Sequence, residues 1–271
     1  ILGLRLEPHQ GRVLAEEGGI RVGHYRCTAC SHDRPVAERF GRTSISMVTS
    51  GSFGVRSHDG TSFLTEGSIL LGNEGDHYEA FHECDGGDVC LVVEYEQDDD
   101  LRTFRRSSLP PDARWTTVAL AIEERTRTAG TALGLAECAH VLLARAQRVF
   151  SERARAKVCE NSPALRRRLG EVAERIRVGA SEMHLSEMAR VARLSPFHLV
   201  RAFKRELGVT PYQYVIQLRL RRAAKLLRDT RMHVSEIAFE VGWGDVSNFV
   251  RYFKRTLLDV KTSANLHFSA I

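Results

Sequence analysis

Five side chains of the first ninety residues have the types and spacing of a soft-metal site. They are Cys27, Cys30, His82, Cys84 and Cys90. The two-residue gap between Cys27 and Cys30 is found in metal knuckles and in redox pairs. In an extended segment His82 and Cys84 face the same side, and Cys90 returns on the next strand after a turn at Gly86-Gly87. If Cys27 and Cys30 lie on a neighbouring strand, the pattern favours zinc or another thiophilic metal.

Other interpretations of these residues stay open. Cys84 and Cys90 also fit as small apolar residues packed inside a β-barrel, with Cys27 buried as well. A small organic effector inside that barrel is the alternative to metal or thiol sensing. The histidines of this region form no close His-x-His pair, and no nucleophile elbow or nucleotide-binding loop occurs. The sequence therefore predicts that the protein is not an enzyme.

The last third of the chain contains an internal repeat at an offset of 49 to 50 residues. Both copies begin with Ser-Glu-x-Ala, at Ser186 and Ser235, and both end with Arg-x-Phe-Lys-Arg, at Arg201 and Arg251. In each copy the first Ser is expected to cap a short helix. The repeat predicts two helix-turn-helix units, because a second helix follows each short one after a tight turn.

The second helix of each unit has an apolar face and a face left for DNA. Turns fall near Arg193-Leu194 and Gly242-Trp243, and Ser195 and Asp245 are expected to cap the second helices. Leu199 with Phe203, and Phe249 with Phe253, are four residues apart and are expected in the core. The residues expected at DNA are Ser195, Phe197, His198, Val200, Arg201, Lys204, Ser247, Asn248, Val250, Arg251 and Lys254.

Arginine and lysine are given different roles on this face. Arg201 and Arg251 occupy equivalent places and suit bidentate contact with guanine, while apolar neighbours suit the thymine methyl group. Lys204 and Lys254 lie a turn further along and suit phosphates. A helix of about 17 residues joins the two units and spans about 25 Å. It would hold the two recognition helices about one duplex turn apart on one face of double-stranded DNA.

Charge divides the chain into two unlike halves. Residues 1–162 carry 19 Lys+Arg and 24 Asp+Glu, a net charge of −5, and residues 163–271 carry 20 and 10, a net charge of +10. A basic part joined to an acidic part is typical of a nucleic-acid-binding domain with a separate partner domain. No apolar run suits a membrane span and no signal peptide is apparent, which predicts no membrane contact and a cytoplasmic protein.

Periodicity places elements along the chain. Short strands separated by turn signals run from about residue 19 to 95 and favour a barrel or sandwich. An acidic run and Pro110-Pro111 mark a linker, and two helices with a break at Gly130 and Gly134 follow over 117–156. Another helix runs from about Pro163, capped by Ser162, to Gly179.

The repeat region resembles the AraC/XylS family of bacterial regulators. The resemblance is carried by LSEMARVARLSPFHLVRAFKRELGVTPYQYVIQLRLRRAAKLL and VSEIAFEVGWGDVSNFVRYFKR, which cover most of residues 185 to 255. The family pairs this module with a variable N-terminal domain, often a cupin-like β-barrel followed by dimerisation helices. One departure is that the usual Gly-x-x-Pro-x-x-Tyr-Arg close is replaced by LDVKTSAN at 258–265. The first unit is therefore expected to dominate binding affinity.

Together these features predict a multidomain α and β protein. The expected parts are a cupin-like β-barrel sensor domain over 1–98, a linker and helical dimerisation segment over 99–162, and an all-α domain with two helix-turn-helix motifs over 163–271. The predicted function is a sequence-specific transcription regulator and homodimer that binds double-stranded DNA, an unknown small effector and, if it activates, RNA polymerase. The alternative is a cysteine-based metal or redox sensor in which DNA contact is secondary.

Overall fold

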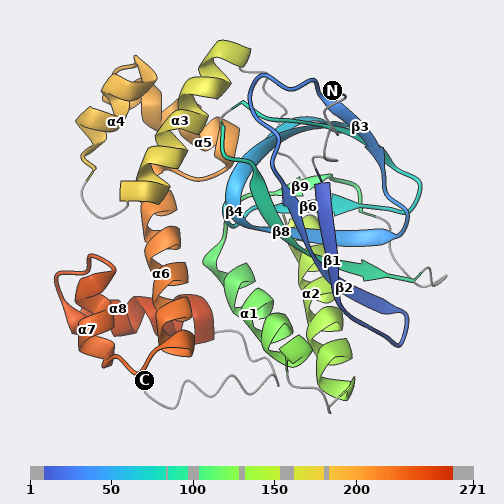
Figure 1. The fold of residues 1–271 in the computed structure, drawn as a ribbon. Helices are drawn as coiled ribbons and strands as arrows, with labels where there is room; N and C mark the ends of the chain where they lie inside the picture. Colours follow the sequence, from blue (N-terminus) through green and yellow to red (C-terminus); the bar gives the residue numbers. More distant parts are fainter. Residues whose placement is uncertain are drawn as a thin grey trace, which may run out of the picture.

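A computed structural model describes residues 9–83, 85–96, 104–127, 132–152, 162–179 and 183–258. It has a β-rich N-terminal part, two connecting helices and a helical C-terminal part (Figure 1). The strands are β1 His9–Glu17, β2 Ile20–Cys27, β3 Val36–Arg39, β4 Thr43–Ser57, β5 Gly60–Thr65, β6 Ile69–Gly72, β7 His77–Phe81, β8 Asp88–Tyr95 and β9 Ser108–Leu109. None of the described helices is long and apolar enough to cross a membrane.

The strands form two antiparallel sheets that share β4. One sheet has the order β1-β2-β8-β4-β6-β9, and β7 joins β3 and the second half of β4 in the other, which also contains β5. The long strand β4 changes sheets near Gly51, where φ is +78° and an added Cβ would lie 2.1 Å from the carbonyl oxygen of Gly87. Glycine is required there because both the backbone conformation and the close approach exclude a side chain.

Alternate residues of the larger sheet fill two separate cores. Val48, Leu70 and Cys90 point between the two sheets, where they pack with Phe53 and Leu64. The residues between them point to the opposite face, which helices α1 and α2 cover. Because strand side chains alternate with a period of two, one strand can serve both cores.

Helices make up the rest of the described chain. They are α1 Ala113–Arg127, α2 Ala132–Glu152, α3 Pro163–Gly179, α4 Leu185–Ala192, α5 Pro196–Leu207, α6 Pro211–Asp229, α7 Val234–Glu240, α8 Val246–Phe253 and the π-helix η1 Lys254–Leu258. Helix α1 contributes to two cores. Trp115 and Ile122 pack on the sheet, and Ala113 and Leu120 pack with α6, α7 and α8. The connector therefore joins the barrel and the helical domain through continuous apolar contact.

The predicted architecture is confirmed: an N-terminal β-barrel, a helical connector and a C-terminal all-α domain with two helix-turn-helix units. The predicted helix from Pro163 to Gly179 is also confirmed, and the backbone N–H of Leu165 donates to Ser162 Oγ at 3.3 Å. Strand β9 lies in the segment predicted as a linker, because Ile69 and Leu70 of β6 pair with it.

Three local predictions were wrong. Gly134 lies inside α2 rather than at a break, and Gly130 lies outside the described residues. Ser186 and Ser235 lie in the first turns of α4 and α7, whose N-caps are His184 and His233. The carboxylate of Glu236 accepts the backbone N–H of His233 at 2.7 Å, so a side chain within the helix caps this end.

Candidate nucleic-acid interface and the adjoining pocket

The first helix-turn-helix unit consists of α4 and α5. Arg193 ends α4 in the left-handed conformation, with φ +54°. Ser195 caps α5 as predicted, because its hydroxyl accepts the backbone N–H of His198 at 3.3 Å. Leu199 and Phe203 have no exposed surface and fix the inner face of α5 against α3, α4 and α6. The opposite face of α5 is left toward solvent.

The second unit consists of α7 and α8. Gly242 makes the turn with φ +83°, and the carboxylate of Asp245 accepts the backbone N–H of Asn248 at 2.5 Å. Phe249 and Phe253 are fully buried, as predicted, and Trp243 packs edge-on against Phe249. The same capping chemistry and the same inner spacing therefore begin both second helices.

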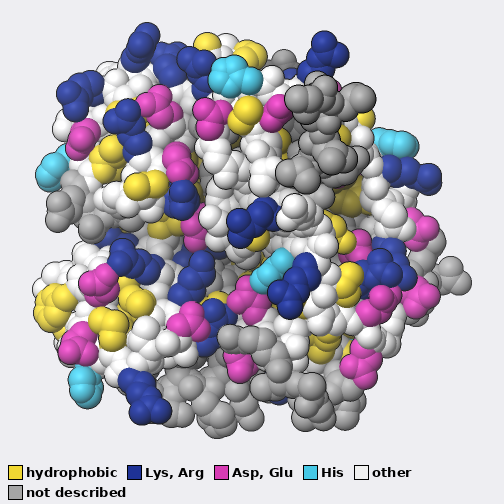
Figure 2. Space-filling view, viewed as in Figure 1, with side chains coloured by type: hydrophobic (Ala, Val, Ile, Leu, Met, Phe, Trp, Pro, Cys, Tyr) yellow, Lys and Arg dark blue, Asp and Glu magenta, His cyan; other side chains and the backbone are white. Residues whose placement is uncertain are grey.

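The predicted DNA-facing residues divide into exposed and half-buried ones. Val200 and Val250 are half-buried, and Val250 packs against the core of the second unit, so their reach toward a base is limited. The others are exposed, namely Ser195, Phe197, His198, Arg201, Lys204, Ser247, Asn248, Arg251 and Lys254. Lys and Arg side chains also gather over α3 and α4 on the face seen in Figure 2, with Asp and Glu between them.

Each equivalent arginine is oriented by a residue one turn earlier. The Arg201 guanidinium lies 5.5 Å from the ring centroid of Phe197, which is 65% exposed. On the second helix an Arg251 Nη2 donates to Asn248 Oδ1 at 2.6 Å. Such contacts restrict the rotamers of a long side chain before it meets a partner.

Helix α6 connects the two units (Figure 1). It has 19 residues and is about 28 Å long at 1.5 Å per residue. Thr210 and Gln213 form a capping box at its start, where Pro211 occupies the first turn. A cleft of about 260 Å³ lies between the two parts of the chain beside this start, and Lys204 of α5 and Asp112 line it.

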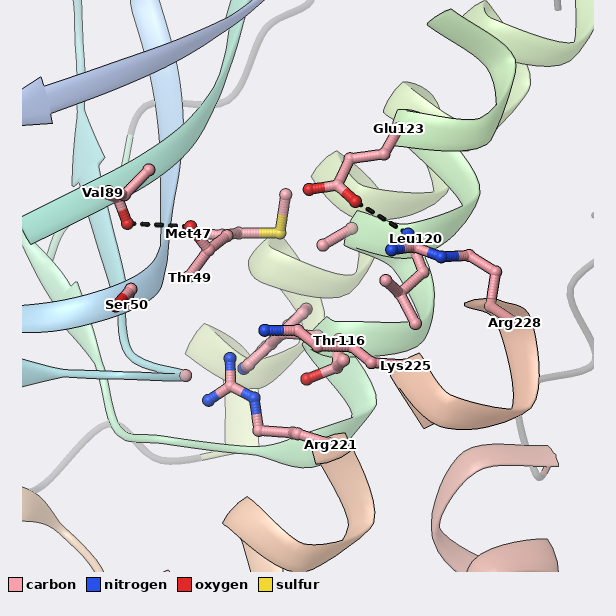
Figure 3. A pocket seen from close by; sticks show the side chains of 13 residues that line it. Met47, Thr49, Ser50, Val89, Thr116, Leu120, Glu123, Arg221, Lys225 and Arg228 are labelled. Atoms are coloured by element: carbon pink, nitrogen blue, oxygen red, sulfur yellow. Dashed lines mark hydrogen bonds and ion pairs between the residues drawn. The ribbon is translucent and has the colours of Figure 1, made fainter. Parts of the chain in front are cut away.

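A pocket of about 340 Å³ lies between the barrel, α1 and α6. Its apolar wall includes Met47, Trp115 and Leu120, and three cations of α6 border it (Figure 3). These cations are Arg221, Lys225 and Arg228. Arg228 pairs with Glu123 of α1 at 2.8 Å, and Lys225 lies 3.8 Å from Glu66.

Two buried side chains in this pocket have polar atoms without a hydrogen-bond partner. Arg221 is 5% exposed, and its Nε and Nη1 atoms have no hydrogen-bond partner, although Nε lies 4.0 Å from a carboxylate oxygen of Glu66, while Nη2 donates weakly to the carbonyl of Val48 at 3.4 Å. The hydroxyl of Thr116 is also buried and unpaired. Burial lowers the pKa of Arg221, although Glu66 opposes this. Unpaired buried polar groups are costly and are concentrated at functional sites.

These three cations of α6 were not predicted as site residues from the sequence. Arg221, Lys225 and Arg228 recur at i, i+4 and i+7, which places them on one face of a helix. This spacing can be seen in the sequence. A basic stripe on a helix is usually solvated, however, and the order of the elements along the chain does not indicate that the barrel covers this one.

A second buried arginine connects α3 to both the barrel and α5. Arg166 Nε lies 2.9 Å from Glu206 of α5, and Arg166 Nη1 lies 3.5 Å from Glu83, just after β7. All three side chains are at most 10% exposed. Burial raises the pKa of Glu83, although the Arg166 charge opposes this.

The predicted metal ligands fall into two neighbouring groups. Cys27 lies with His82 and an unpredicted Asp88, and Cys30 lies with His32 and Asp85; within each group the potential ligand atoms are within 4.8 Å of one another. Cys84 lies outside the described residues. The predicted hairpin was wrong, because β7 pairs with β3 and β4 while β8 pairs with β2 and β4. His82 therefore lies in a loop that crosses between the sheets.

Cys90 is buried on β8 and lies near the first group. Its Sγ donates to Asp88 Oδ2 at 3.4 Å, and the other oxygen of Asp88 lies 2.9 Å from His82 Nε2. Burial lowers the pKa of His82, but Asp88 and Cys27 outweigh burial and raise this pKa to about 9. The imidazole thus lies in a negative local environment.

Comparison with known proteins agrees with this geometry. A family model described as a helix-turn-helix domain matches residues 188–258. The transcriptional activator RhaS of Enterobacter sp. (strain 638) is 40% identical over 76 residues, which are 28% of this chain and 27% of that protein. The regulator MtrA of Neisseria gonorrhoeae is 35% identical over 74 residues, 27% and 25% of the two chains. The match spans about a quarter of the length of these relatives.

A solved structure of ToxT from Vibrio cholerae with an unsaturated fatty acid bound aligns over 94% of this chain and 97% of that chain. Its identity is 14% and its TM-score is 0.37. The capped helix pairs and the matched segment define a helix-turn-helix protein. Within that class, residues 188–258 form a domain of the AraC type, as the sequence resemblance predicted.

Replacement of Arg166 by Ala is expected to destabilise the protein by about 3–5 kcal/mol, because it removes the buried positive charge that contacts Glu83 and Glu206. The control is Arg175→Ala, which breaks an exposed pair with Glu171 on the same helix and should cost less than about 1 kcal/mol. Urea unfolding measures both values. Equal losses of unfolding free energy in Arg166→Ala and Arg175→Ala would contradict the expected larger contribution of the buried Arg166 contacts.

Replacement of Thr116 by Val is expected to stabilise the protein by about 1 kcal/mol, because it removes an unpaired buried hydroxyl at nearly constant shape. The neighbouring Thr117→Val is the control, since its equally buried hydroxyl donates to the carbonyl of Arg114 at 2.8 Å and its loss should destabilise. Urea unfolding of the ligand-free protein checks the opposite signs. Destabilisation by Thr116→Val would contradict this account of the pocket.

Proposed function

We propose that this chain is a sequence-specific DNA-binding transcription regulator whose N-terminal barrel senses a signal. The observation that carries the proposal is the pair of capped recognition helices, which expose equivalent arginines, Arg201 and Arg251, from one basic domain. RhaS and MtrA, to which this part of the chain is similar, are transcription regulators. The alternative that catalysis is the main activity gains no support from the residues in either site.

The roles of the exposed residues follow from their chemistry. Arg201 and Arg251 donate in a planar fork that fits the N7 and O6 acceptors of guanine. Phe197 offers an apolar edge for a thymine methyl group, whereas Lys254 lies further along and meets phosphate. Helix α6 holds the two second helices apart, so one chain reads two successive major-groove segments of double-stranded DNA.

The two units are expected to contribute unequally. The first unit continues through a capped turn into α6, where the Thr210 capping box fixes its end. The second continues into the short η1 helix, and the segment that departs from the family pattern begins at Leu258. We expect the first unit to supply most of the affinity.

The effector is proposed to bind in the pocket between the barrel, α1 and α6. Arg221 and Thr116 offer unpaired donors there, beside the apolar wall that Trp115 and Leu120 provide. A small ligand with an apolar body and an acceptor or anionic group would satisfy both requirements. Because the pocket walls come from both parts of the chain, such a ligand would shift their relative position.

The remaining partners follow from this function. They are double-stranded DNA, RNA polymerase if the protein activates transcription, and a second copy of the chain. The exposed face of α2 includes Glu137, His140 and Ala144. A dimer through that face would therefore be largely polar, and light scattering on the intact protein would establish its size. We place the protein in the cytoplasm, where its DNA target lies.

Replacement of Arg201 or Arg251 by Ala is expected to weaken binding to the cognate duplex by about 1–3 kcal/mol and to relax one base position. Binding curves against a randomised DNA pool, at fixed salt concentration, measure affinity and base preference together. Arg12→Ala is the control, because Arg12 is an exposed arginine of β1 in the barrel. Unchanged affinity and preference in both recognition-helix variants would reject these roles.

A further inference from the structure

The group formed by Cys27, His82 and Asp88 is placed by strand register. Cys27 at the end of β2 pairs directly with Asp88 at the start of β8. Cys90 is two residues further along β8 and therefore faces the same side as Asp88. His82 comes from the loop after β7 and reaches Asp88 Oδ1 at 2.9 Å. Residues from three segments thus converge at one buried end of the barrel.

The donor atoms have the chemistry and spacing of a thiophilic cation site. A thiolate, an imidazole and a carboxylate are typical zinc ligands, and tetrahedral zinc holds its ligand atoms roughly 3.5 Å apart. The three donors here are already within 4.8 Å of one another, so closure around an ion needs only small movements. Cys90, whose Sγ is 3.4 Å from Asp88 Oδ2, is a neighbouring thiol that could complete the set.

Neighbouring contacts hold these ligands in place. The loop after β2 is fixed to the loop after β7 because Asp85 accepts from both the backbone N–H and the hydroxyl of Ser31, at 3.1 and 2.9 Å. Cys27, His82 and Asp88 are each at most 9% exposed. Rigid, buried ligands lose little conformational entropy on binding, which favours affinity.

The loop after β7, which contains His82, also contacts the DNA-binding domain. Glu83 follows His82 directly and contacts Arg166 of α3, and Phe81, on the other side of His82, has its ring centroid 5.9 Å from the Arg166 guanidinium. Arg166 in turn contacts Glu206 of the recognition helix α5. His82 is therefore connected to α5 through the side chains of Glu83, Arg166 and Glu206.

We propose that Cys27, His82 and Asp88 bind a thiophilic divalent cation such as Zn²⁺, and that binding is transmitted through Glu83 and Arg166 to α5. Binding releases the protons of the Cys27 thiol and of the His82 imidazolium to solvent, and the thiolate sulfur and the freed ring nitrogen then bond to the ion. The bound ion fixes Glu83 against Arg166 and so favours the docked position of α5. In that position Lys204 lines a cleft that is also lined by Asp112. The Asp112 carboxylate then competes with a DNA phosphate for contact with Lys204.

Titration of the reduced, metal-stripped full chain with Co²⁺ tests the site, because Co²⁺ replaces zinc and reports thiolate ligands by charge-transfer absorption. One ion per chain is expected, with loss of the absorption and about 100-fold or more weaker binding in Cys27→Ser and His82→Asn. Cys138→Ser, a buried thiol on α2, should bind as the wild type does. Circular dichroism verifies that each variant is folded.

Cys30→Ser separates this site from the more exposed group of Cys30, His32 and Asp85. The Co²⁺ charge-transfer absorption of Cys30→Ser should equal that of the wild type. The site proposal is overturned if the wild-type chain gives no thiolate absorption, if Cys30→Ser loses it as fully as Cys27→Ser, or if mass spectrometry of the untreated protein finds Cys27 in a disulfide.

The transmission rests on the proposed DNA-binding function and has a separate readout. With a duplex selected in vitro for this chain, Zn²⁺ is expected to weaken binding at least about five-fold in the wild type, the lower end of typical allosteric coupling. In Glu83→Gln the Co²⁺ absorption should persist while this effect disappears. An unchanged wild-type affinity would refute the transmission, and failure to select any duplex would refute the proposed function while leaving the Co²⁺ result intact.

Discussion

Two buried arginines, Arg166 and Arg221, determine how the helical domain is placed against the barrel. A guanidinium removed from water loses several kcal/mol of hydration, which only well-placed acceptors can offset. Arg166 has such acceptors in Glu83 and Glu206, which come from different parts of the chain. Arg221 has weaker contacts, 4.0 Å to Glu66 and 3.4 Å to the carbonyl of Val48. One arginine thus fixes the contact, and the other leaves donors available beside a pocket.

Helix α1 makes this contact cooperative. It packs on the sheet through Trp115 and Ile122 and on the helical domain through Leu120, so neither part can move without disturbing a core that α1 shares. Densely packed cores respond to such a disturbance by switching between alternatives rather than by gradual deformation. A ligand beside α1 would therefore act on the position of α6 and, through it, on the spacing of the two recognition helices.

Local patterns predicted the elements better than they predicted the contacts between them. The four-residue spacing of Leu199 with Phe203 and of Phe249 with Phe253 identified the buried faces, and Ser195 and Asp245 were identified as caps, because caps and amphipathic faces depend on neighbours in sequence. Asp88 was missed as a partner of Cys27, since their proximity depends on the β2–β8 register. The hairpin expected around Gly86 was wrong for the same reason: strand order is a property of the whole barrel. Arg166 and Arg221 resemble solvated residues until the other domain covers them.

The pocket and the Cys27 group are connected to two consecutive helices, the pocket to α6 and the Cys27 group to α5. Arg221 of α6 lines the pocket, and Glu83, which follows His82 of the Cys27 group, contacts Arg166, which in turn contacts Glu206 of α5. Helices α5 and α6 are joined by a short capped turn at Gly208 and Thr210, so a shift of one is constrained by the other. Two signals that favour different positions of this helix pair would therefore oppose each other, and two that favour the same position would reinforce each other. By linkage, each would then change the affinity of the other by an equal factor.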